Sequence, residues 1–189
     1  MITKYLTKVL FVLLTLLLIT VSSCKKDDLC ENITCLNGGT CVNGACDCPE
    51  GFAGPDCSNQ QTPSVMRITN IKITRFPATA SNGAGWDVLD GADLYIKMYY
   101  NNSLIYSHPT FYENANPNVD YDFPPNVNLN ITNPTNRYVI SAYDYDTFDD
   151  DFMGGIEFTP YSSNGGFPDK INLDAGGTIA FEVSVEYTF

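Results

Sequence analysis

Aspartates gather at two places in the second half of the chain, and their spacing points most directly to chemistry. Asp87, Asp90 and Asp93 come just before an alternating apolar run, and a second group follows the run that ends at Tyr143: Asp144, Asp146, Asp149, Asp150 and Asp151. Like charges packed into two loop tips repel each other unless a cation lies between them. Calcium takes about six to eight oxygen ligands, which Asp-rich loops supply, so the pattern favours a calcium site. The alternative is two solvated loop ends, because Asp is common in turns.

Cysteine is the second informative residue type. Cys24 stands alone, and the other six lie within 28 residues: Cys30, Cys35, Cys41, Cys46, Cys48 and Cys57. They are surrounded by Asn and Gly with hardly any apolar side chain to build a core, which in an exported chain indicates a disulfide framework. Spacing alone does not choose among the possible pairings. Zinc is the alternative ligand, but a spacing of one residue between two cysteines is unusual for zinc and an oxidising compartment disfavours it.

Residues suited to catalysis are scarce. His108 is the only histidine and precedes a proline, so a Ser and His relay would rest on it alone. All the cysteines are assigned, which leaves no thiol nucleophile. The glutamates that a glycosidase would need show no distinctive motif: Glu113, Glu157, Glu182 and Glu186. We therefore expect no enzymatic activity, with a glycan-active enzyme as a remote alternative.

The N-terminus is built like an export signal. Lys4 and Lys8 precede the apolar stretch 9–21, and small serines follow it, which predicts a signal peptide over 1–23. The apolar stretch is shorter than the roughly 20 residues of a membrane span. The run from Val21 to Cys24 resembles a bacterial lipobox, which implies cleavage before Cys24 and a lipid on its sulfur. Residues 25–28, Lys-Lys-Asp-Asp, resemble the export tags of Bacteroidetes surface lipoproteins; the alternative is a solvated tether. The expected location is the outer membrane, facing the exterior.

The charge balance limits the partners. The chain has a formal net charge of −12, and without residues 1–23 eight basic side chains face 22 acidic ones, a net charge of −14. Nucleic acid and anionic lipid are therefore poor partners without a bridging cation. The apolar fraction of 44% and the aromatic fraction of 13% are those of a folded protein, so the acidity does not indicate disorder.

The cysteine-rich segment 30–57 carries a family resemblance. The run from Cys35 to Cys41 with its Asn-Gly-Gly, and the run from Cys46 to Cys57 with its Gly-Phe-Ala-Gly, resemble an epidermal growth factor (EGF) module. The resemblance implies the disulfides Cys30–Cys41, Cys35–Cys46 and Cys48–Cys57. The calcium-binding subtype of the module needs a longer motif between the third and fourth cysteines than this chain has, so we expect a structural module that acts as a spacer or contact surface.

Residues 65–189 follow a tether at 24–29, the module at 30–57 and a polar linker at 58–64, and their pattern is that of strands. Apolar residues alternate at 71–73, 94–98, 127–131 and, for eleven residues, from Ile179 to Phe189. Asn101 and Asn102 between two runs predict a tight hairpin. No helical period appears after Cys24. Seven or eight strands of this kind predict an antiparallel β-sandwich, so the expected fold class is mainly β.

The acidic loops carry a second resemblance, to the C2 domain, an eight-stranded calcium-binding sandwich. The run Asp93-Leu94-Tyr95-Ile96-Lys97 is similar to that family's Asp-Pro-Tyr-Val-Lys, and residues 144–154 are similar to its third calcium loop. The resemblance implies five metal ligands: Asp87, Asp93, Asp144, Asp146 and Asp151. Leu94 departs from the usual proline, and the third loop is one residue short, so Asp150 is an alternative to Asp151.

The predicted function follows from these modules. We expect an exported lipoprotein, held to a membrane by its lipid, that supports adhesion or recognition of a protein or glycan through weakly bound calcium, with a dissociation constant of about 10⁻⁴ to 10⁻³ M. Four apolar side chains form a candidate loop tip beside the acids, unless they pack within the loops: Trp86, Phe148, Phe152 and Met153. The alternative is a non-catalytic accessory subunit of an outer-membrane complex.

Overall fold

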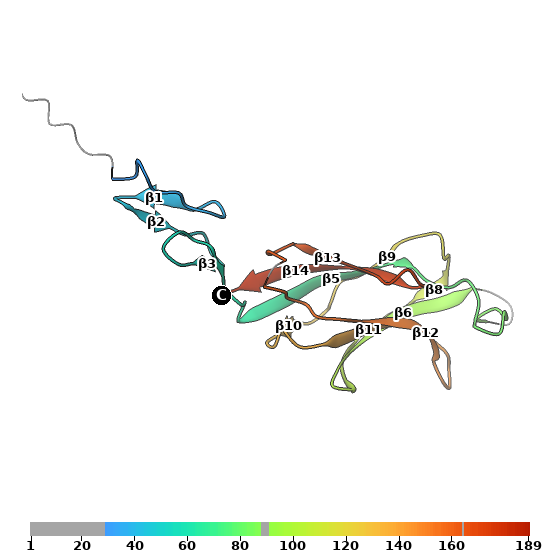
Figure 1. The fold of residues 1–189 in the computed structure, drawn as a ribbon. Coiled ribbons are helices and arrows are strands. Elements are labelled where there is room, and N and C mark those ends of the chain that lie inside the picture. The colour runs from blue at the N-terminus through green and yellow to red at the C-terminus, as the bar shows by residue number, and fades with distance from the viewer. Residues whose placement is uncertain (1–28, 88–90, 164) are drawn as a thin grey trace, which may run out of the picture.

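The computed structural model describes residues 29–87, 91–163 and 165–189, and this part of the chain contains strands and no helix. It has two bodies, a small N-terminal module and a larger sandwich (Figure 1). The predicted signal peptide 1–23 and the lipidation site Cys24 lie outside the described residues, as does most of the tether. No described segment is a helix long and apolar enough to cross a bilayer.

The N-terminal module has almost no apolar interior and is held by cross-links. Its strands are β1 (Thr40–Val42), β2 (Ala45–Asp47), β3 (Phe52–Ala53) and β4 (Asn59–Gln60), which form two small antiparallel ladders. Three disulfides join Cys30 to Cys41, Cys35 to Cys46, and Cys48 to Cys57, the pairing that the EGF resemblance implies. Asn43 and Gly44 both adopt positive φ in the turn between β1 and β2, as a two-residue hairpin requires.

The sandwich consists of two five-stranded sheets that face each other as two layers (Figure 1). The first has the order β10-β5-β14-β13, with β9 also paired to β5; its strands are β5 (Val65–Arg75), β9 (Tyr121–Phe123), β10 (Leu129–Ile131), β13 (Lys170–Asp174) and β14 (Ala180–Thr188). The second has the order β12-β11-β6-β7, with β8 also paired to β6; its strands are β6 (Ala92–Tyr100), β7 (Ser103–Ser107), β8 (Tyr112–Ala115), β11 (Tyr138–Asp144) and β12 (Asp151–Phe158).

Ten strand segments replace the eight expected strands because each sheet has one interrupted edge. β7 and β8 pair with the same edge of β6, and β9 and β10 with the same edge of β5. Pro109 separates the first pair of segments, and Pro124 and Pro125 separate the second. Proline has no amide proton to give to a ladder, so pairing stops there and resumes further on. The predicted antiparallel sandwich is present, and in each sheet one edge is interrupted by proline.

The core consists of the inner faces of the long strands, as the alternation predicts. Ile71 and Ile73 of β5 are buried, and so are Leu94, Ile96 and Met98 of β6. The predicted hairpin at residues 101–102 joins β6 to β7, with φ of 48° at Asn101 and 60° at Asn102. One expected strand is shorter than predicted: β10 begins at Leu129, and Val127 lies exposed outside it because the preceding prolines hold that segment away from β5.

The predicted linker 58–64 is not a free tether. Asn59 and Gln60 form β4 and pair with β3, so the N-terminal module extends through Gln60. The Gln60 side-chain amide donates to the Gly166 carbonyl at 3.1 Å, and the Tyr161 hydroxyl donates to the Gln61 carbonyl at 2.9 Å. The polar groups of this linker therefore hydrogen-bond to the sandwich.

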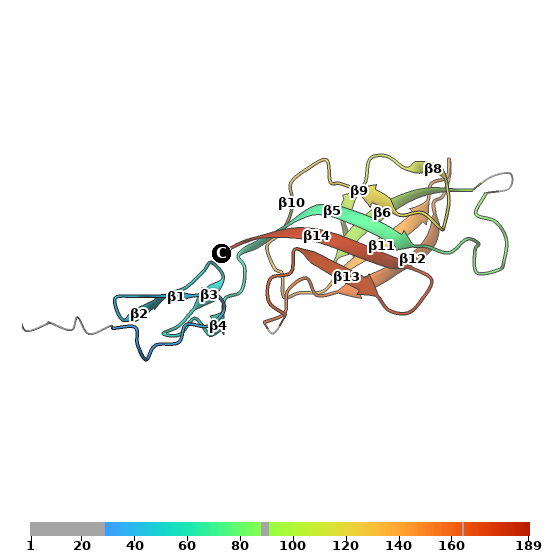
Figure 2. The same cartoon turned by 90° about the horizontal axis from the view of Figure 1, so that it is seen from above.

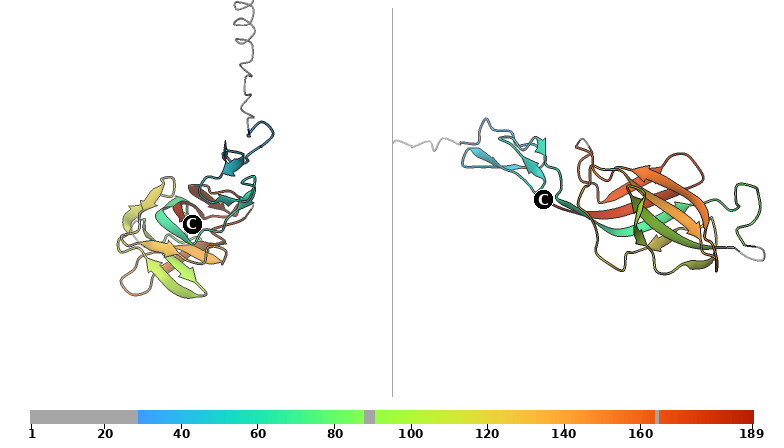
Figure 3. Two further views of the ribbon diagram at one scale, coloured as in Figure 1. Left: turned by 90° about the vertical axis from the view of Figure 1, so that its left-hand side faces the viewer. Right: turned by 90° about the horizontal axis from the view of Figure 1, so that it is seen from below.

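An aromatic cluster completes the junction between the two bodies. The Phe52 ring lies edge-on to Phe167 at 5.3 Å between centroids, and Phe167 contacts Phe189 at 4.8 Å. Gly51 packs so closely that a Cβ placed on it would lie 2.5 Å from a carbon of Phe167. Two further views show the module joined to the end of the sandwich where β5 starts and β14 finishes (Figure 3).

Candidate functional site at the acidic pole

The two Asp-rich segments meet at the end of the sandwich that lies away from the N-terminal module (Figures 1 and 2). β6 begins there, β11 ends there and β12 begins there. The charges of Asp87, Asp93 and Asp146 all raise the pKa of Asp144. We call these four residues the acidic pole. Both Asp-rich segments therefore lie at one end of the fold, as a shared metal site between them would need.

Asp144 is the centre of this group and is completely buried. It is the last residue of β11, in which Tyr138, Ile140 and Ala142 face the core, and the period of two carries Asp144 to the same face. The backbone N–H of Asp93 donates a hydrogen bond to Oδ1 of Asp144. Oδ2 of Asp144 is buried with no hydrogen-bond partner among the described residues. A buried carboxylate oxygen without a donor is costly, so this atom calls for a ligand.

Burial raises the pKa of Asp144 to about 6, although the hydrogen bond from the Asp93 amide opposes the shift. The nearby charges of Asp87, Asp146 and Asp93 raise it further, because each disfavours a second negative charge. Near neutral pH the carboxylate is thus held against both desolvation and repulsion. A bound cation would relieve both effects.

The fold supplies no internal counter-ion for the pole. Each lysine and arginine within residues 29–87, 91–163 and 165–189 already pairs with an acid, and only the pair of Lys97 with Asp150 involves a residue of these loops. No described lysine or arginine pairs with Asp93, Asp144 or Asp146.

Asp151 and its alternative Asp150 lie differently from the other predicted ligands. Asp151 is exposed and stands opposite Asp144 in the β11–β12 ladder, but it is not among the charges that raise the pKa of Asp144. Asp150 accepts hydrogen bonds at Oδ2 from the Tyr95 hydroxyl and, at 2.8 Å, from the Lys97 ammonium. Asp150 is thus already neutralised and is a poor replacement for Asp151, because removing it from Lys97 would break that pair.

The four predicted tip residues divide into two kinds. Phe148 is 97% exposed and Phe152 is 59% exposed, whereas Met153 is buried in the core. Trp86 is half-buried, and its indole N–H donates to the Pro77 carbonyl at 2.7 Å. Only the two phenylalanines therefore form an exposed tip. A cavity of about 800 Å³ lies beside it, lined by Asp151, Phe152, Met153, Trp86, Thr178 and residues 77–82.

The donor types suit a hard cation such as calcium, since carboxylate oxygens are its usual ligands. Within the described part of the chain, however, no three acidic, histidine or cysteine side chains already surround one point closely enough to hold a metal ion. If an ion binds here, Asp87, Asp93, Asp144 and Asp146 are the residues that would hold it. Asp93 has one oxygen engaged, because its Oδ1 accepts the Asn114 amide at 3.0 Å.

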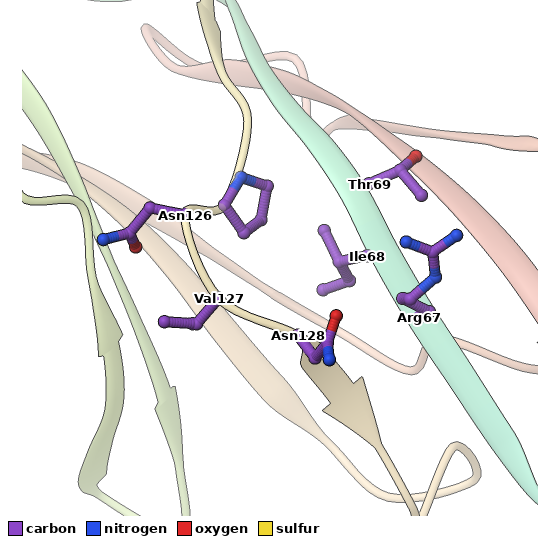
Figure 4. A pocket seen from close by; sticks show the side chains of 7 residues that line it. Arg67, Ile68, Thr69, Asn126, Val127 and Asn128 are labelled. Atoms are coloured by element: carbon purple, nitrogen blue, oxygen red, sulfur yellow. The ribbon is translucent and has the colours of Figure 1, made fainter.

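Two other features are less informative. His108 has Nδ1 2.9 Å from the Thr110 carbonyl and Nε2 3.3 Å from the Pro124 carbonyl, so both ring nitrogens are engaged by backbone. A cavity of about 340 Å³ lies where β9 and β10 separate along β5, lined by Arg67, Thr69, Asn126, Asn128 and their neighbours (Figure 4). Arg67 forms an ion pair with Glu186, which leaves this cavity without an uncompensated charge.

Sequence reasoning missed one cluster, the ion pair of Lys97 and Asp150 with its surrounding rings. In the sequence, Tyr95, Lys97 and Tyr99 are simply the residues that alternate with the apolar side chains of β6, and no role was predicted for them. Their regular spacing places all three on the outer face of the sheet, and this was the available signal.

Comparisons with known proteins match the N-terminal body by sequence. The EGF-like domain family model matches residues 24–57. The EGF-like repeat and discoidin I-like domain-containing protein 3 of Mus musculus is 50% identical over 40 residues, which is 18% of this chain and 8% of that protein. The chain therefore matches only a small part of this relative. The first body is an EGF-like module by both fold and sequence.

Solved structures similar to the sandwich are C2 domains. One, described as the structure of a C2 domain, is 17% identical and covers 65% of this chain and 97% of its own, with a TM-score of 0.43. The calcium-bound pair of C2 domains from Extended-Synaptotagmin 2 is 18% identical, covering 67% of this chain and 46% of its own, with a TM-score of 0.40.

Proposed function

We propose that this chain is a non-catalytic binding protein whose sandwich recognises its ligand with the support of calcium held at the acidic pole. The carrying observation is Oδ2 of Asp144, a buried carboxylate oxygen without a hydrogen-bond donor among the described residues, in the field of three further carboxylates. Because no described lysine or arginine is left to compensate this charge, an external cation is the simplest stabilising partner.

Calcium bound at this position would hold the two loops together and would offer open coordination positions to oxygen atoms of a partner. The loop between β11 and β12 and the start of β12 carry the exposed Phe148 and Phe152. An apolar tip beside a bound cation suits a partner that offers both oxygen ligands and apolar groups. This is the basis for assigning recognition or adhesion to the pole.

We further propose that the chain is exported and held to an outer membrane through a lipid on Cys24, with the EGF-like module as a spacer. Support comes from the leader-like residues 1–23 and from three disulfides, which persist in oxidising compartments. Support for a spacer role comes from the junction at Phe167, which joins the module to the end of the sandwich opposite the acidic pole.

The calcium proposal is tested by thermal unfolding of the disulfide-bonded chain after chelation and dialysis. A ligand that binds only the folded state stabilises it by mass action. With the affinity expected of extracellular sites, about 10 mM calcium should stabilise by roughly 1–3 kcal/mol and raise the melting temperature by about 3–10 °C. An unchanged melting curve removes calcium from the proposal.

A double substitution locates the effect. Asp93→Asn with Asp146→Asn keeps the shape of both side chains and the acceptor for Asn114, but removes two charges from the pole. The calcium-dependent rise should disappear while the metal-free circular dichroism spectrum is unchanged. The matched control is Asp169→Asn, an exposed aspartate next to β13 at the end where the EGF-like module joins, which should keep the full response. A full response in the double variant would mean that calcium binds elsewhere.

A further inference from the structure

A cavity of about 310 Å³ opens on the outer face of the second sheet, next to the acidic pole but separate from it. Aromatic and polar groups alternate in its lining, and the principal contributors are Tyr95, Lys97, His108, Phe111, Tyr145 and Asp150. They come from β6, from the segment that interrupts β7 and β8 at Pro109, and from the two ends of the loop between β11 and β12. The volume is at the small end of the range for small-molecule sites, about 300–1,000 Å³.

The aromatic half of this cavity is a set of rings held in fixed positions. Phe111 and Tyr145 stack face to face, with 4.6 Å between centroids and 12° between planes. Tyr95 meets Tyr145 edge-on at 6.1 Å. Tyr145 is nevertheless 46% exposed, so an aromatic surface remains open to solvent on a support that already restricts its rotamers. Rigid aromatic surfaces of this kind bind ligands at a low cost in side-chain entropy.

The polar half is preorganised by hydrogen bonds. Lys97 donates to Oδ2 of Asp150 at 2.8 Å, and the Tyr95 hydroxyl donates to the same oxygen. Lys97 Nζ also lies 4.2 Å from the centroid of the Tyr143 ring, which fixes the ammonium group over an aromatic face. Oδ1 of Asp150 accepts only a long hydrogen bond of 3.4 Å from the Asp146 amide. This oxygen keeps acceptor capacity, and the ammonium group keeps donors.

Charge decides which ligand fits. The ion pair of Lys97 and Asp150 leaves the cavity close to neutral, and the chain as a whole carries a net charge of −12. A phosphorylated or uronic ligand would have to compete with Asp150 for Lys97 in a repulsive field. A neutral ligand with an apolar C–H face and hydroxyl groups that both donate and accept would match the rings and the ion pair together. A pyranose ring has these properties.

We propose that this cavity is a binding subsite for a neutral saccharide, which stacks on Tyr145 and hydrogen-bonds to Asp150 and Lys97. The inference rests on the proposed recognition function and names its ligand class. It also couples the two sites, because Tyr145 and Asp150 bracket Asp146 in the loop between β11 and β12. A cation bound to Asp144 and Asp146 would contact the same loop and hold it in place, so calcium should strengthen saccharide binding.

The test uses the full disulfide-bonded chain and a panel of soluble probes. The neutral probes are gluco-, manno-, galacto- and xylo-oligosaccharides, and the acidic probes are oligogalacturonate and inositol hexakisphosphate. Binding is measured by calorimetry with calcium and with chelator, and the site is mapped by amide chemical-shift changes in the unmodified protein. We expect at least one neutral oligosaccharide to bind, with the largest shifts around Phe111, Tyr145 and Asp150.

Two substitutions and one control locate the contact. Tyr145→Ala removes the stacking surface and should weaken binding by about tenfold or more, as loss of an aromatic anchor typically does. Lys97→Met removes the donor and should weaken binding comparably. Leu104→Ala is the control, because it removes an exposed apolar side chain from β7 of the same sheet outside the cavity, and saccharide affinity should not change. The shift map in the unmodified chain decides the question if a variant fails to fold.

The results separate this inference from the calcium proposal. If neutral saccharides bind in chelator and calcium does not change the melting temperature, the saccharide subsite is supported and the calcium proposal is rejected. If calcium raises the melting temperature but no neutral saccharide binds, the saccharide subsite is rejected and the calcium proposal stands. Binding restricted to the acidic probes, shifts centred away from Tyr145, or no binding to any neutral probe overturns the inference.

Discussion

Asp144 shows how a single side chain acquires an unusual role from an ordinary strand. The alternation that buries Tyr138, Ile140 and Ala142 also buries the next residue of that face, which happens to be acidic. At most strand ends the side chain of such an acid would point into solvent. Here the amide of Asp93 holds one of its oxygens, and the other remains inside without a donor among the described residues.

The raised pKa of Asp144 gives a prediction for the metal-free protein. Its folded-state pKa of about 6 lies above the ordinary aspartate value of 3.8, so between about pH 4 and pH 6 the folded state binds the proton more tightly than the unfolded chain. Stability from this group is therefore present at low pH and lost as pH rises through that window. Asp144→Asn should remove the loss and raise the metal-free stability at pH 7.5 by on the order of 2 kcal/mol.

The measurement is chemical unfolding in chelator at pH 4 and at pH 7.5. The variant and the parent should be similar at pH 4, where the parent carboxyl is protonated, and should diverge at pH 7.5. Asp169→Asn, which changes an exposed carboxylate, should follow the parent at both values. A variant that is less stable than the parent at pH 7.5 would show that the Asp144 charge is already compensated within the fold.

At this scale the sequence located the acids but not their partners. The sequence predicted that Asp87, Asp93, Asp144, Asp146 and Asp151 form one metal site. In the structure the charges of Asp87, Asp93 and Asp146 act on Asp144, but no three described acids surround one point closely enough to hold a metal ion. The role of Asp150 was not predictable, because its partner Lys97 lies 53 residues earlier and only the pairing of β11 with β6 brings the two near each other. A one-residue difference in a loop decides which of two adjacent aspartates meets the lysine.

The long strands made the fold class predictable, whereas the edge strands of the two sheets were not predictable. Alternation in β5, β6 and β14 is long enough to determine both type and face, as the buried Ile71, Ile96 and Val183 confirm. The edge strands depend on where proline interrupts the ladder, which a pattern of apolar residues does not report. The contacts of the polar linker were not predictable either, since Gln60 and Gln61 hydrogen-bond to a surface that only the folded sandwich presents.

The junction between the two bodies gives a prediction at this scale. Gly51 has φ of 86°, and a Cβ on it would approach Phe167 to 2.5 Å and Phe189 to 2.7 Å. Gly51→Ala should therefore push the module off the aromatic cluster and lower stability by roughly 1–3 kcal/mol. The measurement is ¹⁵N relaxation, in which the parent should tumble as one body and the variant should show separate correlation times for residues 30–57 and 65–189.

Gly38 provides the matched control, because it has nearly the same φ, 82°, with nothing within 4 Å of an added Cβ. Gly38→Ala should carry only the backbone strain of a left-handed residue, about 1 kcal/mol, and should leave the junction rigid. Equal loosening in both variants would assign the effect to strain within the module and would contradict a role for the close contact with the rings.

Across the whole molecule, charge and shape are arranged along one axis. The EGF-like module joins the sandwich where β5 begins, and the acidic pole lies where β5 ends (Figure 2). A chain attached through its N-terminus would then present the pole away from the attachment point. The modular order was readable from the sequence because cysteine density and alternation change sharply near residue 60. The direction of the pole was not readable, since it depends on the contacts of Phe167.

The net charge of −12 leads to a prediction for the response of the whole chain to salt. Added ions screen the repulsion among the acids, and they also weaken the ion pairs. The ion pairs of the described residues are mostly at the surface, where each contributes about 0–1 kcal/mol, so the relief of repulsion should dominate. In chelator, raising sodium chloride from about 20 to 500 mM should increase the melting temperature, and saturating calcium should reduce this increase, because the bound ion compensates part of the repulsion at the pole. A melting temperature that falls with salt would show that the ion pairs outweigh the repulsion, and the acidic pole would then no longer need a cation.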